Sequence, residues 1–312
     1  MTSTVGKPLK ALNEVGSRVV PVSEPIEKKG GLEENPRGFE GVRIAIVHDW
    51  LAEVGGAEKV LAEMLKIFPD AALFSLLDTI PRSDRGFLAG KPVQTTFLQK
   101  IPGVKKIYRH LLLLMPLAVE HLDLSSYELI ISSSHAVAKG LITGPDQLHL
   151  CYCHSPARYA WDMQELYLRQ AGFGRGITGF FARALLHYIR IWDSRTANGV
   201  DAFAANSSFV ARRIWKVYRR KCRVIHPPVD VMAYSKGGAA ETVLPGKTGV
   251  LFTKQSVDSL KEAVLSFEKL NFDSQYLRSN AKRFAPAVFR KGLLSWAEAE
   301  WKRFNARRVR FI

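Results

Sequence analysis

The sequence predicts an α/β fold, with a doubly wound parallel sheet over most of the chain followed by a truncated, mainly helical segment. Short apolar runs alternate with longer segments of helical spacing, which is the order of a sheet built from strand–helix–strand units. The runs are apolar throughout, as in strands that are covered on both faces. Polar or small residues follow most of them, so these residues gather at the carboxyl edge of the sheet, where such folds bind ligands.

Seven apolar runs are expected to form the strands of this sheet. They cover residues 42–47, 71–77, 93–97, 127–132, 148–154, 200–205 and 222–226. A glycine-bearing loop, Gly55-Gly56, follows the first strand. A helix is expected after it, because the apolar residues between Val60 and Leu65 have helical spacing.

Three further helical patterns lie between the later strands. They cover residues 104–121, 177–197 and 209–219. The first is expected to be interrupted near Pro116, since proline removes a backbone donor. Ser207 or Ser208 is suited to cap the last, because a serine hydroxyl accepts a hydrogen bond from an amide of the first turn.

The alternation stops after Pro228. Residues 246–252 suggest one turn and one strand, and helical patterns then follow over residues 256–270, 274–283 and 288–305. About 85 residues with so few strands cannot build a second sheet of the same kind. This segment is therefore expected to pack on the first domain or to stay partly mobile.

Composition excludes several classes of protein. Apolar residues form 47% of the chain, enough for a globular core, but no run reaches the ~20 apolar residues of a membrane-spanning helix. The first 40 residues mix Lys, Glu, Pro and Gly, unlike an export signal. The three cysteines, Cys151, Cys153 and Cys222, are therefore expected to be free thiols in the cytoplasm, and Cys151 and Cys153 to be small buried side chains rather than zinc ligands.

The net charge of +16 is concentrated in two blocks, residues 212–223 and 302–310, which also contain aromatic residues. One interpretation is that both are amphipathic helices with solvated basic faces. The other is attachment to the anionic inner leaflet of the plasma membrane. Nucleic acid is not expected as a partner, because the sequence has no nucleic-acid-binding signature.

Five segments, in the same order along the chain, resemble the retaining, glycogen-synthase-like enzymes of glycosyltransferase family 4. They cover residues 43–58, 127–136, 151–162, 205–208 and 224–230. The resemblance implies the GT-B fold of two Rossmann-like domains. A glycine-rich segment over residues 233–243 resembles a late part of the second domain of that fold.

The chain departs from this family between Asp230 and Ala233, where most of the second domain is missing. The missing part would supply the Gly-Arg and Lys groups that hold the donor phosphates and a pair of glutamates. The resemblance thus implies a disordered leader over residues 1–41, an acceptor-side domain over residues 42–231, and a remnant of the donor-side domain with its closing helix over residues 232–312.

Gly55, Gly56 and His154 are the leading candidates for the functional site. Glycines after the first strand let backbone N–H groups approach an anion at a helix N-terminus, although they also suit an ordinary tight turn. The resemblance implies that this loop faces the donor phosphates and the acceptor. It also implies that His154 contacts the donor sugar beside the anomeric carbon, as the catalytic residue; the alternative is a structural histidine.

Five other residues are weaker candidates for donor or acceptor binding. Asp49 could accept an acceptor hydroxyl or cap the next helix, and capping is favoured. Arg158 could pair with an acceptor phosphate or with Asp162. The resemblance places Gly237, Gly238 and Glu241 on the donor side, with Glu241 at the ribose.

The resemblance implies transfer of a sugar from a nucleotide-sugar to a lipid-linked or polysaccharide acceptor, with no cofactor and no essential metal. We expect a cytoplasmic protein, at the inner face of the plasma membrane if the basic blocks bind lipid. Because one half of the cleft is mostly missing, turnover is in question. The alternative is an inactive paralogue that binds an acceptor, a membrane or a partner. Helices after residue 256 that lack their usual partner also predict self-association.

Overall fold

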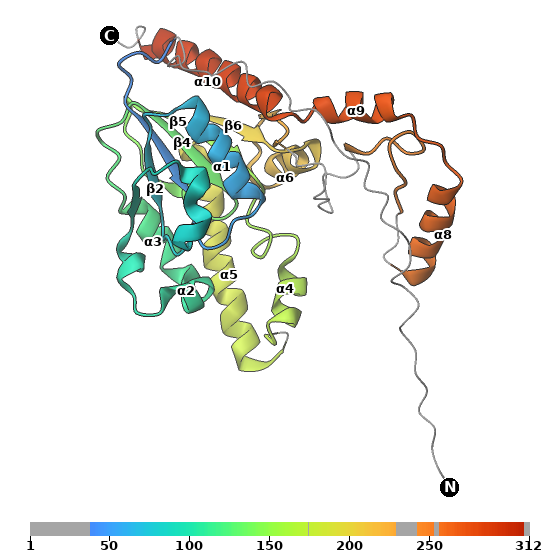
Figure 1. Ribbon diagram of the computed structural model, residues 1–312. Helices are drawn as coiled ribbons and strands as arrows, with labels where there is room; N and C mark the ends of the chain where they lie inside the picture. The colour runs from blue at the N-terminus through green and yellow to red at the C-terminus, as the bar shows by residue number, and fades with distance from the viewer. Residues whose placement is uncertain (1–37, 174, 229–241, 253–255, 309–312) are drawn as a thin grey trace. The chain divides into compact units, whose positions relative to one another are not determined.

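The computed structural model describes residues 38–173, 175–228, 242–252 and 256–308. Seven strands in this part of the chain form one parallel sheet in the order β3-β2-β1-β4-β5-β6-β7 (Figure 1). They are β1 (Ile44–His48), β2 (Ala72–Ser75), β3 (Val93–Thr95), β4 (Leu129–Ser134), β5 (Leu148–Cys153), β6 (Ala202–Ala205) and β7 (Cys222–Val224). This confirms the predicted doubly wound parallel sheet.

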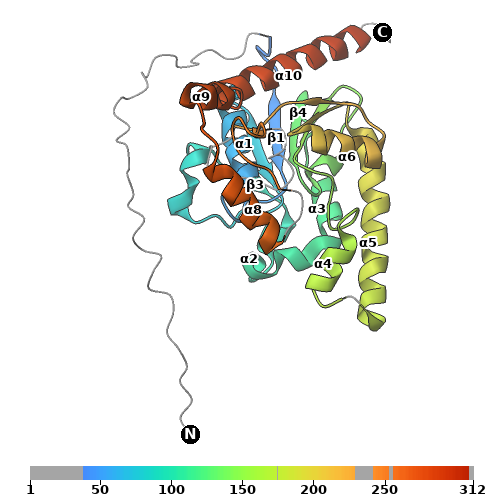
Figure 2. The same cartoon turned by 90° about the vertical axis from the view of Figure 1, so that its right-hand side faces the viewer.

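Helices cover both faces of the sheet (Figure 2). The α-helices are α1 (Gly56–Ile67), α2 (Val104–Ile107), α3 (Met115–Glu120), α4 (Gln164–Gln170), α5 (Gly176–Thr196), α6 (Ser208–Tyr218), α8 (Val257–Glu268), α9 (Ser274–Lys282) and α10 (Pro286–Arg308). Short 3₁₀ helices are η1 (Arg82–Leu88), η2 (Phe97–Lys100), η3 (Tyr108–Leu113), η4 (Ala138–Gly140) and η5 (Ala197–Gly199). Helices α1 and α10 pack on one face, and α3, α5 and α6 contribute to the cores on the other.

The order of the strands reverses at β1. The chain runs outward from β1 through β2 to β3, then returns to pair β4 with the free side of β1. The carboxyl ends of β1 and β4 thus lie together at the point where the direction changes, with His48 in register with Ser133. In open α/β sheets this switch point is the usual place for a ligand.

The described fold begins earlier in the sequence than predicted. Phe39 is buried, with its ring centroid 5.6 Å from that of Phe68 and 6.1 Å from that of Trp301. The prediction of a disordered leader over residues 1–41 is therefore wrong for residues 38–41, because this aromatic side chain completes the core beneath α10. Residues 1–37 lie outside the described part.

Of two local predictions, the one near a proline is confirmed and the one near a glycine needs correction. The pattern over residues 104–121 is interrupted near Pro116 as predicted: it divides into α2, η3 and α3, and Pro116 lies in the first turn of α3. The expected strand within residues 246–252 is absent from the described structure, where Pro245 and Gly249 form only an isolated bridge around a turn. Gly246 has a φ of +75° there, which suits a tight turn.

The predicted cap and the predicted buried cysteines are both confirmed. Ser207 caps α6, since its hydroxyl accepts a hydrogen bond of 3.2 Å from the amide of Val210. Cys151 and Cys153 are buried free thiols in the core beneath α6.

The last helices differ from one another in how they pack. Helix α10 buries Phe289, Leu293 and Trp296 in the core that it shares with α1 and the sheet. Helices α8 and α9 bury no residue of their own, and α8 leaves several apolar side chains exposed. None of the described helices is both long and apolar enough to cross a membrane.

A buried ion pair joins α5 to the turn after β4. Lys139 is 2% exposed, and its Nζ lies 2.8 Å from Oδ1 of Asp193, which is fully buried. Trp161 and Tyr218 donate hydrogen bonds of 2.7 and 2.9 Å to Oδ2 of the same carboxylate. The ammonium also lies over the rings of Tyr218 and Trp192, so the pair ties three helical segments to the sheet.

Candidate active site

A cluster of polar side chains lies at the switch point of the sheet. His48 ends β1, Ser133 lies near the end of β4, and His154 directly follows β5. Because parallel strands present their carboxyl ends at one edge, residues 85 and 21 positions apart along the chain become neighbours there. This is the edge at which the sequence predicted a ligand site.

Hydrogen bonds connect this cluster in a chain that ends at His154. Glu58 Oε1 lies 3.4 Å from Nε2 of His48, and Nδ1 of His48 lies 3.1 Å from Oγ of Ser133. The same hydroxyl lies 2.9 Å from Nε2 of His154. The Ser133 hydroxyl therefore bridges two imidazoles and fixes the ring orientation of His154.

His154 is held in its neutral form. Burial is the main cause that lowers its pKa, to about 3, and repulsion by His135 and His48 acts in the same direction. The backbone around it is also fixed, since Asn206 donates a hydrogen bond of 3.0 Å to its carbonyl oxygen. A neutral imidazole of fixed orientation is suited to a hydrogen bond with a sugar hydroxyl.

The Gly55-Gly56 loop lies at the N-terminus of α1. Glu58 reaches back to the start of its own helix, where its Oε2 accepts a hydrogen bond of 2.8 Å from the amide of Gly55. Both glycines are exposed. A Cβ at Gly56 would meet no atom within 4 Å, and one at Gly55 would meet only the Glu58 carboxylate at 3.2 Å. The loop is therefore open on its outer side, which leaves room for a ligand beside the helix N-terminus.

Asp49 has a role that the sequence did not predict. It was expected to cap the following helix, but α1 has Gly55 at its N-cap. Asp49 is instead fully buried, and its two oxygens accept four hydrogen bonds of 2.5 to 2.9 Å from the backbone amides of residues 135–138. The carboxylate thus stabilises the turn between β4 and η4, and contact with an acceptor hydroxyl would have to compete with these amides.

His135 lies beside Asp49 at the edge of the cluster. Its Nδ1 is 2.9 Å from Oδ2 of Asp49 without the alignment of a hydrogen bond, so the contact is that of an ion pair. Burial opposes the charge on this ring, but the nearby carboxylate outweighs burial and raises the pKa of His135. The site thus places a histidine whose pKa is raised beside one whose pKa is lowered.

The remaining predicted residues are separate from this cluster or outside the described part. Arg158 is exposed and has no ion-pair partner among the residues that the structure describes, while Asp162 pairs with Arg213 rather than with Arg158. Gly237, Gly238 and Glu241 lie outside the described residues.

Sequence reasoning did not select His48, Ser133 or Glu58, although all three lie in the segments that carry the family resemblance. The signal that could have found them is position, because polar residues at the ends of adjacent buried strands must meet at one edge.

Two histidines with lowered pKa values predict that stability falls on acidification. The pKa of His149 is lowered to about 3, mainly by burial, as is that of His154. An unfolded histidine takes up its proton near pH 6.5. Between that pH and about 3 the unfolded chain therefore binds more protons, and folding weakens as pH falls. His135 does not add to this loss of stability below pH 6.5. Because its pKa is raised in the folded protein, its full contribution to the free energy of unfolding is already present at pH values below the unfolded pKa.

We expect the free energy of unfolding, measured with urea, to fall between pH 6.5 and 5. The protonation of His149 in the unfolded chain should account for about 1.4 kcal/mol of this fall per pH unit. His154, which is partly exposed, should add a smaller amount. His149→Gln should remove the larger share of this slope. Equal slopes in the parent and the variant would contradict the assignment.

The fold is that of a Rossmann-like domain, and the polar cluster at its switch point is the candidate site. The family model for glycosyltransferase family 4 matches residues 54–232, which is more than half of the chain. The chain therefore belongs to glycosyltransferase family 4. A comparison of the sequence with curated proteins found no match.

Two solved structures are distantly similar. A crystal structure of HepE from Anabaena in complex with UDP and glucose is 12% identical and aligns with 83% of this chain and 100% of its own, at a TM-score of 0.38. A complex between a UDP-glucosyltransferase from Polygonum tinctorium, capable of glucosylating indoxyl, and 3,4-dichloroaniline is 14% identical. It aligns with 78% of this chain and 70% of its own, at a TM-score of 0.32.

Proposed function

We propose that the protein binds a nucleotide-sugar at the switch point of its sheet and is a retaining glycosyltransferase of the GT-B type. The observation that carries this proposal is the neutral His154, fixed by Ser133 beside the open Gly55-Gly56 loop. A diphosphate suits the N-terminus of α1, and a sugar hydroxyl suits the imidazole. Membership of the family supports the same assignment.

In this proposal the nucleotide-sugar is the donor substrate, and no resident cofactor is needed. Transfer breaks the bond between the anomeric carbon and the diphosphate, forms a bond to an acceptor oxygen, and releases the proton of the acceptor. His154 positions the sugar, and the acceptor is lipid-linked or part of a polysaccharide. The acceptor-side domain is residues 42–231, and residues 232–312 are what remains of the donor-side domain.

A second candidate is a module that binds an acceptor, a membrane or a partner without catalysis. It is favoured by the part of the chain after Pro228, where the described residues contain helices and one isolated bridge but no second sheet. The groups that hold donor phosphates in the resembled family come from that second sheet. This candidate predicts that nucleotide-sugars bind weakly or not at all.

Calorimetric titration of nucleoside diphosphates and nucleotide-sugars separates the two candidates. The first predicts binding that His154→Ala weakens about tenfold, through the loss of one hydrogen bond at a desolvated site. Gly55→Trp should abolish binding by filling the open side of the loop. The matched controls are His110→Ala and Gly86→Trp, since both residues are exposed and a Cβ at Gly86 meets no atom within 4 Å. No binding by any compound, or equal losses in the controls, would favour the module.

A further inference from the structure

Helix α5 carries an exposed apolar stripe along one face. The stripe consists of Ile177, Phe180, Phe181, Tyr188 and Ile191. Their spacing of three, four and seven residues places them on one side of a helix. The first three are 78%, 69% and 66% exposed, which is unusual for aromatic and β-branched side chains.

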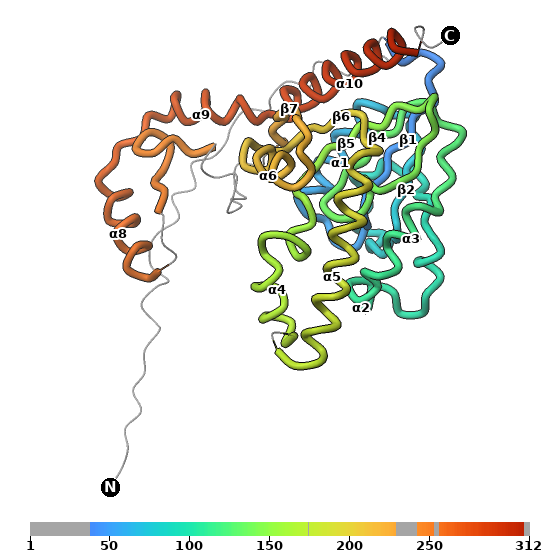
Figure 3. Tube along the Cα trace, turned by 180° about the vertical axis from the view of Figure 1, so that it is seen from behind, coloured from blue at the N-terminus to red at the C-terminus, as the bar shows by residue number. Residues whose placement is uncertain are grey.

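Helix α5 packs against the rest of the protein through residues outside the stripe. Leu186 and Ile189 pack in a small core with Leu168 of α4, and Trp192 packs in the core beneath the sheet. Helix α5 therefore has two apolar faces. One packs in the core of the protein, and the other, the stripe, is exposed. Figures 1 and 3 show α4 and α5 extending together beyond one edge of the sheet.

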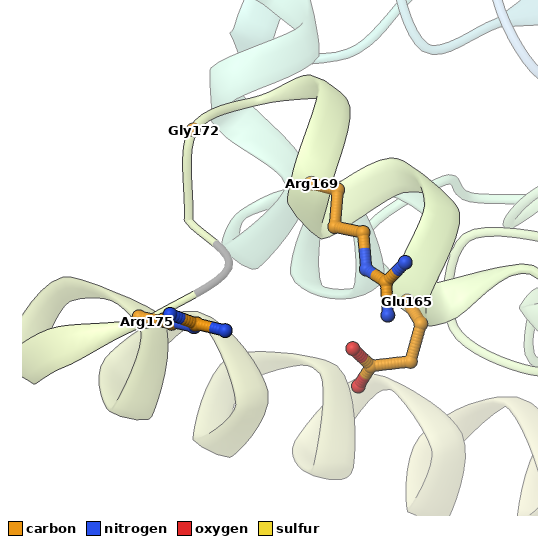
Figure 4. Close-up of a pocket in the computed structure, with 4 residues that line it drawn as sticks. All are labelled: Glu165, Arg169, Gly172 and Arg175. Atoms are coloured by element: carbon orange, nitrogen blue, oxygen red, sulfur yellow. The ribbon is translucent and has the colours of Figure 1, made fainter.

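The surroundings of the stripe are basic. Between Met163 and Trp192 the sequence has four arginines, at 169, 175, 183 and 190, and a single carboxylate, Glu165. Arg169 and Arg175 line a pocket of about 500 Å³ between α4 and the start of α5. Figure 4 shows both side chains and Glu165 directed into the space between them.

A second apolar and basic segment lies at the same end of the sheet. The helices α2, η3 and α3 expose Leu113, Leu114 and Leu117 together with Lys105 and Lys106. Leu112 of this segment packs against the core formed by α4 and α5. Figure 2 shows α2, α4 and α5 at the same end of the sheet.

We propose that the α5 stripe, with the basic residues around it, seats the protein on the surface of an anionic lipid bilayer. Aromatic side chains bordered by arginines are the composition of elements that lie in the membrane interface, where the rings enter the acyl boundary and the guanidinium groups meet phosphates. A basic protein of net charge +16 is attracted to such a surface. A second molecule of this protein is a less suitable partner for the stripe than a bilayer. A symmetric contact between two molecules would place the arginines of both against each other.

The bilayer surface lies on the same side as the candidate site. The chain passes from His154 to α4 in about ten residues, so the carboxyl edge of the sheet and the stripe are linked directly. For the transfer reaction, this would bring a lipid-linked acceptor to the site, a consequence that rests on the proposed function. Attachment to the bilayer itself does not require nucleotide-sugar binding.

Flotation of the full chain with vesicles tests the proposal without any sugar-nucleotide. Vesicles of phosphatidylcholine with 30% phosphatidylglycerol should carry the protein, and pure phosphatidylcholine vesicles should carry it at least tenfold less. Phe180→Ser and Phe181→Ser should each reduce the partition coefficient about tenfold. Leu260→Ser and Val264→Ser are the matched controls, since these apolar residues of α8 are also exposed, at 50% and 49%, and lie outside the stripe. They should leave partition unchanged.

Two results would overturn the proposal. One is vesicle binding that survives both Phe→Ser changes but is lost in Lys302→Gln with Arg307→Gln at the far end of α10, which would place the contact there. The other is no vesicle binding together with a dimer that the Phe→Ser variants convert to monomer in sedimentation equilibrium. Phe181→Trp gives an independent check, because its fluorescence should be quenched by lipids brominated in the upper acyl chain.

Discussion

Replacement of Asp49 by alanine is expected to lower the free energy of unfolding by about 4 kcal/mol or more. The carboxylate accepts four backbone hydrogen bonds from residues 135–138, and the residues that donate them are mostly buried. Each buried amide left without a partner costs about 1 to 3 kcal/mol. Burial opposes the charge on Asp49, but His135 and the amides outweigh burial and hold its pKa well below the ordinary value.

Urea denaturation of three variants measures this effect. Asp49→Asn keeps the shape but replaces one acceptor oxygen with a donor, so its loss should be intermediate. Asp162→Ala removes an exposed carboxylate that pairs with Arg213 and should cost at most about 1 kcal/mol. If Asp49→Ala lost no more stability than Asp162→Ala, the turn after β4 would not depend on this carboxylate.

The second large effect is expected at the buried ion pair. Asp193→Ala should destabilise the fold by about 3 to 5 kcal/mol, because it leaves the ammonium of Lys139 buried without its counter-charge. The same change removes the acceptor of Trp161 and Tyr218. Thermal and urea unfolding of the single variant give this value.

A double variant separates the charge from the packing. Lys139→Met with Asp193→Leu replaces both charges with apolar side chains, and buried pairs replaced in this way often regain stability. We expect the double variant to be more stable than Asp193→Ala by about 2 kcal/mol. A double variant that is less stable than Asp193→Ala would show that the unpaired ammonium of Lys139 is not the main cause of the loss.

The sheet could be predicted from the sequence because its strands carry their own signal. Ile44, Ile131 and Leu150 lie in short apolar runs that are typical of a covered parallel strand, and these runs form β1, β4 and β5. The prediction failed where local pattern and tertiary context differ. The apolar run at residues 250–252 resembles a strand, yet no neighbouring strand pairs with it in the described structure, and Leu251 and Phe252 remain exposed.

The candidate site could be predicted only in part. His154 and the glycine loop were found because both carry motifs, and their position at one edge follows from the topology. The partners of Asp49 could not be found, since they lie 86 to 89 residues away along the chain. The role of Ser133 depends on the register between β1, β4 and β5, which no local pattern encodes.

Hydrogen–deuterium exchange with and without a nucleotide-sugar tests the central claim most directly, that the switch point is where this protein binds its ligand. The compound to use is the tightest binder in the calorimetric titration, at saturation. We predict slower exchange in residues 51–58, 133–138 and 153–158, the three segments that meet at the carboxyl edge of the sheet. Unchanged exchange in all three segments, with or without protection elsewhere, would contradict the proposed site.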